Sequence, residues 1–197
     1  MRPTREKSEN PHAAYFVTTQ TARRQPFFRH ERWATLLREI ILHYTGTGYS
    51  LHAWVIMPDH LHMLLVPTET LEKAVQLIKG GFSFRAKREF TWNSDIWQPG
   101  FTDRRIRDEA EWKNHLNYIR MNPVHAHLVS DSCLYPYMDF PASAFPQGLK
   151  PPSSPHTSDV RAEARTLQAD SFPSQVESHS FQTEARSISS TSNEVSQ

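Results

Sequence analysis

The hydrophobic pattern along the first third of the chain predicts strands that alternate with a helix. Residues 14–20 are aromatic and β-branched, which is typical of a strand. Over residues 31–44 the apolar positions recur at helical spacing, which predicts an amphipathic helix. Residues 49–57 and 60–66 are two apolar runs separated only by Pro58 and Asp59. This connection is so short that we expect the two runs to pair as antiparallel strands.

The next stretch predicts a helix, a strand and a third helix. Apolar positions over residues 70–90 favour a second helix, and residues 96–106 contain a fourth strand. Asp108 and Glu111 have the spacing of a capping box and are expected to start the third helix. The order β-α-β-β-α-β-α indicates an α+β chain.

The first six predicted elements match a ferredoxin-like split βαβ plan. That plan has a four-stranded antiparallel sheet with two helices on one face. The third helix is additional and can cover part of the other face. Many unrelated proteins share this architecture, so the predicted fold does not define a function.

Composition divides the chain into parts. Hydrophobic residues make up 38% of the whole, and from about residue 143 the sequence turns to Ser, Pro, Thr and Gln. Such a stretch cannot bury enough apolar surface to offset its chain entropy. We therefore predict a flexible N-terminus over residues 1–9, a folded domain over 10–141 and a disordered Ser/Pro-rich tail over 142–197.

The net charge of +1 conceals a mildly basic body. Residues 1–142 hold 18 basic and 15 acidic side chains, which leaves them with a net charge of +3. This charge permits a nucleic-acid partner without requiring one. The single cysteine, Cys133, excludes an internal disulfide framework. No secretory signal or membrane-length apolar run is present, so we expect a soluble, cytoplasmic protein with no membrane partner.

His60 and His62 stand two residues apart on a predicted strand. Side chains alternate along a strand, so both imidazoles should emerge on the same face while Leu61 points into the core. Two imidazoles placed in this way could ligate one divalent metal ion. Alternatively, they are two polar residues on a half-exposed strand.

Tyr118 and Asn122 are four residues apart on the third predicted helix and share one face. They lie beside the apolar side of this helix. If that apolar side packs on the sheet, Tyr118 and Asn122 are held near the sheet. Asn122 could supply an amide oxygen and Tyr118 a phenol oxygen. Alternatively, Asn122 caps a turn that begins at Pro123, and Tyr118 is an ordinary residue at the edge of the core.

Basic residues surround the aromatic residues Phe82 and Phe84 on the second helix, and others follow the fourth strand. Cations that meet phosphates and rings that stack on bases would suit single-stranded nucleic acid. An ordinary helix with a solvated charged face is the other interpretation. The predicted DNA-binding residues are Lys79, Arg85, Lys87, Arg88, Arg104, Arg105 and Arg107.

Three motifs in order resemble the single-tyrosine HUH transposases, and most closely the REP-associated tyrosine transposases within the IS200-like group. They are MPDHLHMLL at residues 57–65, WQPGFTDR at 97–104 and YIRMNPV at 118–124. The resemblance covers about residues 10–130. Two positions depart from the expected pattern, because Pro99 stands where a polar or basic residue is expected and Thr102 where a His or Tyr is expected.

This resemblance implies a set of roles. His60, His62 and Asn122 would hold a divalent metal ion, Mg²⁺ or Mn²⁺, and Tyr118 on the third helix would be the nucleophile. Such enzymes cleave and rejoin single-stranded DNA, usually at hairpins from palindromic repeats, through a 5′-phosphotyrosine. The chain would act as a monomer or homodimer.

Two other functions remain open on the sequence. A metal-dependent phosphoesterase would use the same histidines to activate water and would form no covalent product. A non-catalytic or domesticated DNA-binding protein would recognise palindromic repeats without cutting them.

Overall fold

The computed structural model describes residues 13–141 and 144–146, all of which belong to one compact unit. The predicted flexible segment 1–9 and nearly all of the predicted tail 142–197 lie outside the described residues. The predicted domain boundaries therefore stay predictions. Phe145, which follows the predicted end of the domain, packs against Trp112 with ring centroids 5.6 Å apart.

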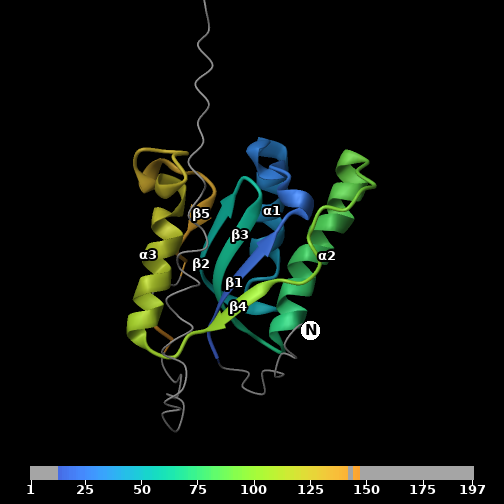
Figure 1. The fold of residues 1–197 in the computed structure, drawn as a ribbon. Helices are drawn as coiled ribbons and strands as arrows, with labels where there is room; N and C mark the ends of the chain where they lie inside the picture. Colours follow the sequence, from blue (N-terminus) through green and yellow to red (C-terminus); the bar gives the residue numbers. More distant parts are fainter. Residues whose placement is uncertain (1–12, 142–143, 147–197) are drawn as a thin grey trace, which may run out of the picture. The chain divides into compact units, whose positions relative to one another are not determined.

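An antiparallel sheet of five strands, in the order β4-β1-β3-β2-β5, forms the centre of the fold (Figure 1). The strands are β1 (Tyr15–Gln20), β2 (Tyr49–Met57), β3 (His60–Pro67), β4 (Thr102–Arg105) and β5 (Met138–Asp139). The first four have the order of the predicted split βαβ plan, which confirms the predicted α+β class.

The predicted count of four strands is wrong by one strand. β5 pairs with Trp54 and Val55 of β2, and the nearby Tyr135 hydroxyl donates a hydrogen bond to the Ile56 carbonyl over 2.7 Å. A strand of two residues is too short to show any alternation of apolar and polar positions. It forms because tertiary packing brings it to the open edge of β2.

Helices cover both faces of the sheet. The helices are α1 (Glu31–His43), α2 (Leu71–Phe90) and α3 (Glu109–His125). α1 and α2 lie together on one face, and α3 lies alone on the opposite face (Figure 1). No helix in the described ranges combines the length and apolar character needed to cross a membrane.

The register between β1 and β3 decides which side chains face which helix. Val17 pairs with Met63, and both belong to the core beneath α1 and α2. Phe16 pairs with Leu64 on the opposite face, where both pack in the core beneath α3. Because side chains alternate along a strand, the sheet has one apolar face for each helix layer.

Local signals in the sequence set the ends of the helices. The Thr70 hydroxyl accepts a hydrogen bond from Lys73 N at the start of α2, and the Asp108 carboxylate accepts one from Glu111 N at the start of α3. The Glu111 carboxylate accepts in turn from Arg107 N, one residue before the cap. Gly81 lets α2 approach α1 closely, because a Cβ at this position would stand 3.1 Å from the Tyr44 ring.

The buried face of β3 supports the strand that carries the two histidines. Leu61 lies between them and has no exposed surface. We expect Leu61→Ala to lower the free energy of unfolding by about 2 to 5 kcal/mol, because it removes buried apolar contacts and leaves a cavity. Leu42→Ala, at an exposed position on α1, should change it by less than about 0.5 kcal/mol. Urea denaturation measures both, and equal effects would contradict the prediction.

Candidate active site

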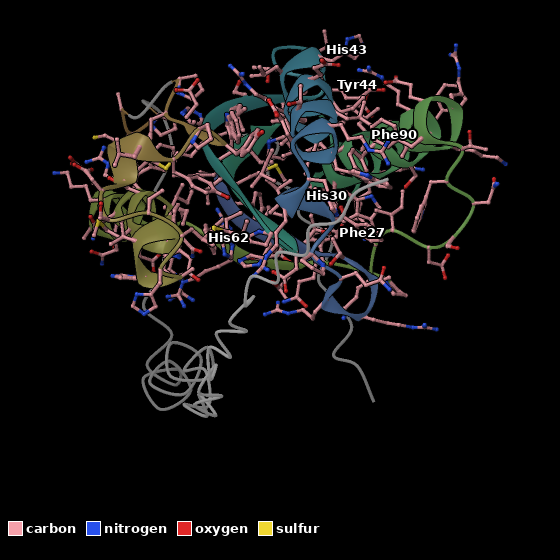
Figure 2. The ribbon with its side chains drawn as sticks, turned by 90° about the horizontal axis from the view of Figure 1, so that it is seen from above. Phe27, His30, His43, Tyr44, His62 and Phe90 are labelled. Atoms are coloured by element: carbon pink, nitrogen blue, oxygen red, sulfur yellow. The ribbon has the colours of Figure 1, made fainter. Side chains whose placement is uncertain are left out.

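His60 and His62 extend from β3 toward α3, on the same face of the sheet. Their ring centroids are 4.7 Å apart. β1 lies beside them, with Gln20 paired to His60 and Thr18 paired to His62. Figure 2 shows His62 in the layer between the sheet and α3, whereas the labelled Tyr44 and Phe90 lie with α1 and α2.

Thr18 orients the His62 ring. The Thr18 hydroxyl lies 2.8 Å from Nδ1 of His62, and Nε2 of the same ring is buried without a hydrogen-bond partner among the described residues. If Nδ1 carries the proton and donates it to Thr18, Nε2 presents a lone pair. Burial, followed by the charges of His60 and Arg24, holds the pKa of His62 well below its usual value. The ring is therefore neutral at pH 7, the state that a metal ligand requires.

Asp59 orients the His60 ring in the same way. Its Oδ1 lies 2.6 Å from Nδ1 of His60, so that Nε2 of His60 presents the lone pair. The other carboxylate oxygen, Oδ2, is 3.0 Å from Nε of Arg24. Burial tends to raise the pKa of Asp59, but the His60 hydrogen bond and the charges of His60 and Arg24 outweigh it and lower that pKa. The sequence did not single out Asp59, although its place directly before His60 was visible.

An aromatic cluster joins α3 to the histidine pair. The Phe16 ring lies between the two layers, with centroids 5.3 Å from His62, 4.6 Å from His115 and 5.6 Å from Tyr118. The rings of Tyr118 and His62 are 5.2 Å apart. The fold therefore brings together Tyr118 and His62, which are far apart in the sequence.

His115 belongs to the same cluster. Its Nδ1 lies 2.7 Å from the Glu111 carbonyl, which can only accept a hydrogen bond, so Nδ1 carries the proton. Burial and the nearby positive charge of Arg104 lower the pKa of His115, although the Glu111 hydrogen bond acts in the opposite direction. His115 lies on α3, three residues before Tyr118.

Asn122 lies half-buried on α3, one turn after Tyr118. α3 continues through Pro123 to His125, so Asn122 does not cap a turn that begins at Pro123, and that alternative is wrong. Asn122 as a metal ligand stays a prediction.

A protein-family model described as "Transposase IS200 like" matches residues 11–122, which is more than half of the chain. The chain belongs to the IS200-like transposase family. The resemblance carried by the three sequence motifs is thereby confirmed, and DNA cleavage is the activity that this family implies.

Two relatives and one solved structure show how near the similarity is. Over 132 residues the transposase is 26% identical to the REP-associated tyrosine transposase of Escherichia coli K12, which covers 64% of this chain and 75% of that protein. Over 97 residues it is 34% identical to a Haemophilus influenzae protein named as a REP-associated tyrosine transposase. This match covers 43% of this chain and 55% of that protein. A solved REP-associated tyrosine transposase bound to a REP hairpin has the same fold, with a TM-score of 0.61 and 23% sequence identity. The match covers 70% of this chain and 82% of that chain.

The transposase site fits a divalent metal ion, judged by its donor atoms. Nε2 of His62 is a buried, neutral nitrogen without a partner among the described residues, and Nε2 of His60 belongs to a ring oriented by a carboxylate. Within the described residues, His, Cys, Asp and Glu form no group of three that could hold a metal. A further protein ligand would therefore be a different residue type, as the amide of Asn122 is.

The basic residues on α2 lie on the other face of the sheet from the histidines. Lys79 Nζ donates hydrogen bonds to the carbonyls of Gln98 and Gly100, over 2.7 and 2.8 Å, and burial lowers its pKa. Its charge thus holds the 97–100 segment in place. Arg85 forms ion pairs with Glu39 and Glu89. Both side chains have protein partners, and their predicted DNA contacts remain untested.

Lys87 and Arg88 lie exposed on α2, and Arg88 stands over the Phe84 ring at 5.6 Å from its centroid. Phe84 is 60% exposed, as base stacking requires, whereas Phe82 is fully buried in the core, so the predicted base stacking by Phe82 is wrong. The structure does not bring this cluster to the histidines, because α2 and α3 cover opposite faces (Figure 1).

The basic residues that follow the 97–100 segment divide between the two faces. Arg104 pairs with Phe16 and forms an ion pair with Glu111, so it lies on the histidine face. Arg105 pairs with Tyr15 and therefore faces the α2 side. The backbone N of Arg107 donates to Glu111.

The neutral histidines predict a pH-dependent stability. In the folded chain the pKa values of His62 and His115 are lowered, whereas the unfolded chain takes up a proton on each near pH 6.5. Acid therefore favours unfolding, with a slope of at most about 1.4 kcal/mol per pH unit for each histidine. The pKa of Asp59 is lowered, so this carboxylate stays ionised between pH 7 and pH 5.

We expect the free energy of unfolding to fall from pH 7 to pH 5, and to fall less steeply in His62→Gln. His43→Gln, at an exposed position on α1, is the matched control and should keep the wild-type slope. Urea denaturation at several pH values measures the slopes. An identical slope in wild type and His62→Gln would contradict the prediction.

Proposed function

We propose that this transposase cleaves and rejoins single-stranded DNA through a covalent bond to Tyr118, with a divalent metal ion held by His60, His62 and Asn122. The observation that carries the proposal is the 5.2 Å approach of the Tyr118 and His62 rings, combined with the buried, unpartnered Nε2 of His62. A DNA hairpin is the proposed substrate. The solved relative that is bound to a REP hairpin supports this choice.

The chemistry is a transfer of a phosphoryl group to the protein. The Tyr118 oxygen forms a bond to phosphorus while the bond between phosphorus and the 3′ oxygen breaks. The phenol loses its proton and the departing 3′ oxygen gains one, which leaves a 5′-phosphotyrosine and a free 3′-hydroxyl. Because the phosphodiester bond energy is retained in the intermediate, the reverse attack by a 3′-hydroxyl rejoins the strand without ATP.

The side chains around Tyr118 prepare this attack. The Phe16 ring meets the Tyr118 ring edge to face, with an interplanar angle of 87°, and restricts its position. Thr18 and Asp59 hold the two imidazoles with Nε2 available as the ligand nitrogen. When bound, a divalent cation supplies positive charge that stabilises the phosphate in the transition state and favours the ionised phenol.

Tyr118→Phe should bind hairpin DNA like the wild type and form no covalent adduct, because it lacks only the nucleophilic oxygen. A denaturing gel of labelled hairpin oligonucleotide incubated with Mn²⁺ detects the adduct. Tyr44→Phe, directly after α1 on the opposite face of the sheet, is the matched control and should form the adduct normally. Cleavage by Tyr118→Phe would remove Tyr118 from the role, and cleavage without any adduct in the wild type would favour the phosphoesterase.

His62→Ala should weaken Mn²⁺ binding by at least about tenfold and abolish cleavage, because it removes the buried ligand nitrogen. Titration of Mn²⁺ monitored by calorimetry reports binding without DNA. His43→Ala is the control and should bind Mn²⁺ like the wild type. If neither His62→Ala nor EDTA impairs cleavage, the metal part of the proposal fails. Repeat-hairpin binding without cleavage under any condition would indicate a non-catalytic DNA-binding protein.

A further inference from the structure

The loop between β1 and α1 is fastened to the turn that precedes His60. The backbone N and the hydroxyl of Thr21 both lie 2.9 Å from the Asp59 carbonyl, and Thr21 has no exposed surface. Further along the loop, Phe28 N donates to the Pro58 carbonyl over 3.0 Å. The loop therefore holds a defined position beside the histidine pair.

Two consecutive arginines in this loop adopt a backbone conformation that residues other than glycine rarely take. Arg23 and Arg24 have φ values of 55° and 56°. Each left-handed residue costs about 1 kcal/mol or more. Hydrogen bonds on either side maintain the conformation, since Ala22 N donates to Ile96 O over 2.7 Å and the Thr21 hydroxyl also reaches Gln25 O at 2.8 Å. Backbone strain of this kind is concentrated at functional sites.

The Arg24 side chain is connected to His60 through Asp59. Asp59 gives one carboxylate oxygen to His60 and the other to Nε of Arg24, so the guanidinium does not form a two-point pair with the carboxylate. Among the described residues, no acceptor is assigned to the Nη groups of Arg24, whose side chain is 44% exposed.

We propose that Arg24 binds a phosphate of the DNA strand at the cleavage site through its Nη groups, while its Nε holds Asp59. The planar guanidinium fork matches two phosphate oxygens, and the neighbouring carboxylate fixes its direction. This inference rests on the proposed function, because it names the residue that places the DNA backbone beside His60 and Tyr118. Arg23 has the same charge and backbone conformation and no assigned partner among the described residues, so it is a matched control.

The test measures DNA binding in EDTA, without metal and without cleavage. Phosphate contacts do not depend on base sequence, so the probe is a labelled oligothymidylate of about 20 nucleotides, longer than a typical single-strand site. Fluorescence anisotropy at several salt concentrations gives the affinity and its salt dependence for the full-length protein. We expect Arg24→Ala to weaken binding by about tenfold and to reduce the slope of log K against log salt by about 1.

Two further variants separate phosphate binding from a structural role. The fold-loss of affinity in Arg23→Ala should be less than about a third of the fold-loss in Arg24→Ala. Arg24→Lys should recover part of the salt slope that Arg24→Ala loses, because lysine keeps the positive charge. Asp59→Asn should lose less affinity for oligothymidylate than Arg24→Ala, because it loosens the direction of the guanidinium but keeps its positive charge and removes a nearby negative charge. Equal losses in Arg23→Ala and Arg24→Ala, or a loss in Asp59→Asn as large as in Arg24→Ala, would overturn the assignment.

This experiment keeps the inference distinguishable from the proposed function. Wild-type affinity and salt slope in Arg24→Ala, together with a normal Tyr118 adduct in the wild type, would overturn the role of Arg24 alone. A selective loss of binding in Arg24→Ala, together with no adduct in the wild type, would support Arg24 as a phosphate-binding residue and reject strand transfer through Tyr118.

Discussion

The pairing of β1 with β3 is the constraint on which the rest of the site depends. It sets Thr18 against His62 and Gln20 against His60. Because side chains alternate along a strand, a shift of β3 by one residue would turn His60 and His62 toward the core beneath α1 and α2. Leu61 and Met63, fully buried beneath α1 and α2, prevent that shift. The apolar packing of one face thus holds the polar chemistry of the other face in place.

Around this frame, each histidine has a partner that fixes its Nδ1, and the two partners come from different elements. Thr18 reaches His62 from the neighbouring strand, and Asp59 reaches His60 from the turn before it. The Asp59 carboxylate leaves Nε2 of His60 with a lone pair, and Nε2 of His62 has one as well when Nδ1 of His62 donates to Thr18. Phe16 connects this arrangement to α3, because its ring contacts both His62 and Tyr118. The sheet and α3 therefore meet at this ring, beside the candidate site residues.

The two faces of the sheet divide the charged residues. The basic residues of α2 accompany an exposed Phe84 on one side, while Arg24 and Arg104 belong to the histidine side. Lys79 and Arg85, which the sequence presents as cations, have protein acceptors or carboxylates beside them. A count of positive residues in a motif therefore overstates the charge that is available to a phosphate.

The sequence by itself determined the order of the elements, the split βαβ plan and the His60-Leu61-His62 arrangement, because hydrophobic periodicity and strand alternation are local properties. The motifs around Tyr118 and Asn122 also indicated the family. Only the tertiary structure decided the partners Thr18, Asp59 and Phe16, the fifth strand and the faces of Arg104 and Arg105. Those features depend on the register between strands and on docking of the β1–α1 loop. They arise from contacts between distant segments, which no local pattern records.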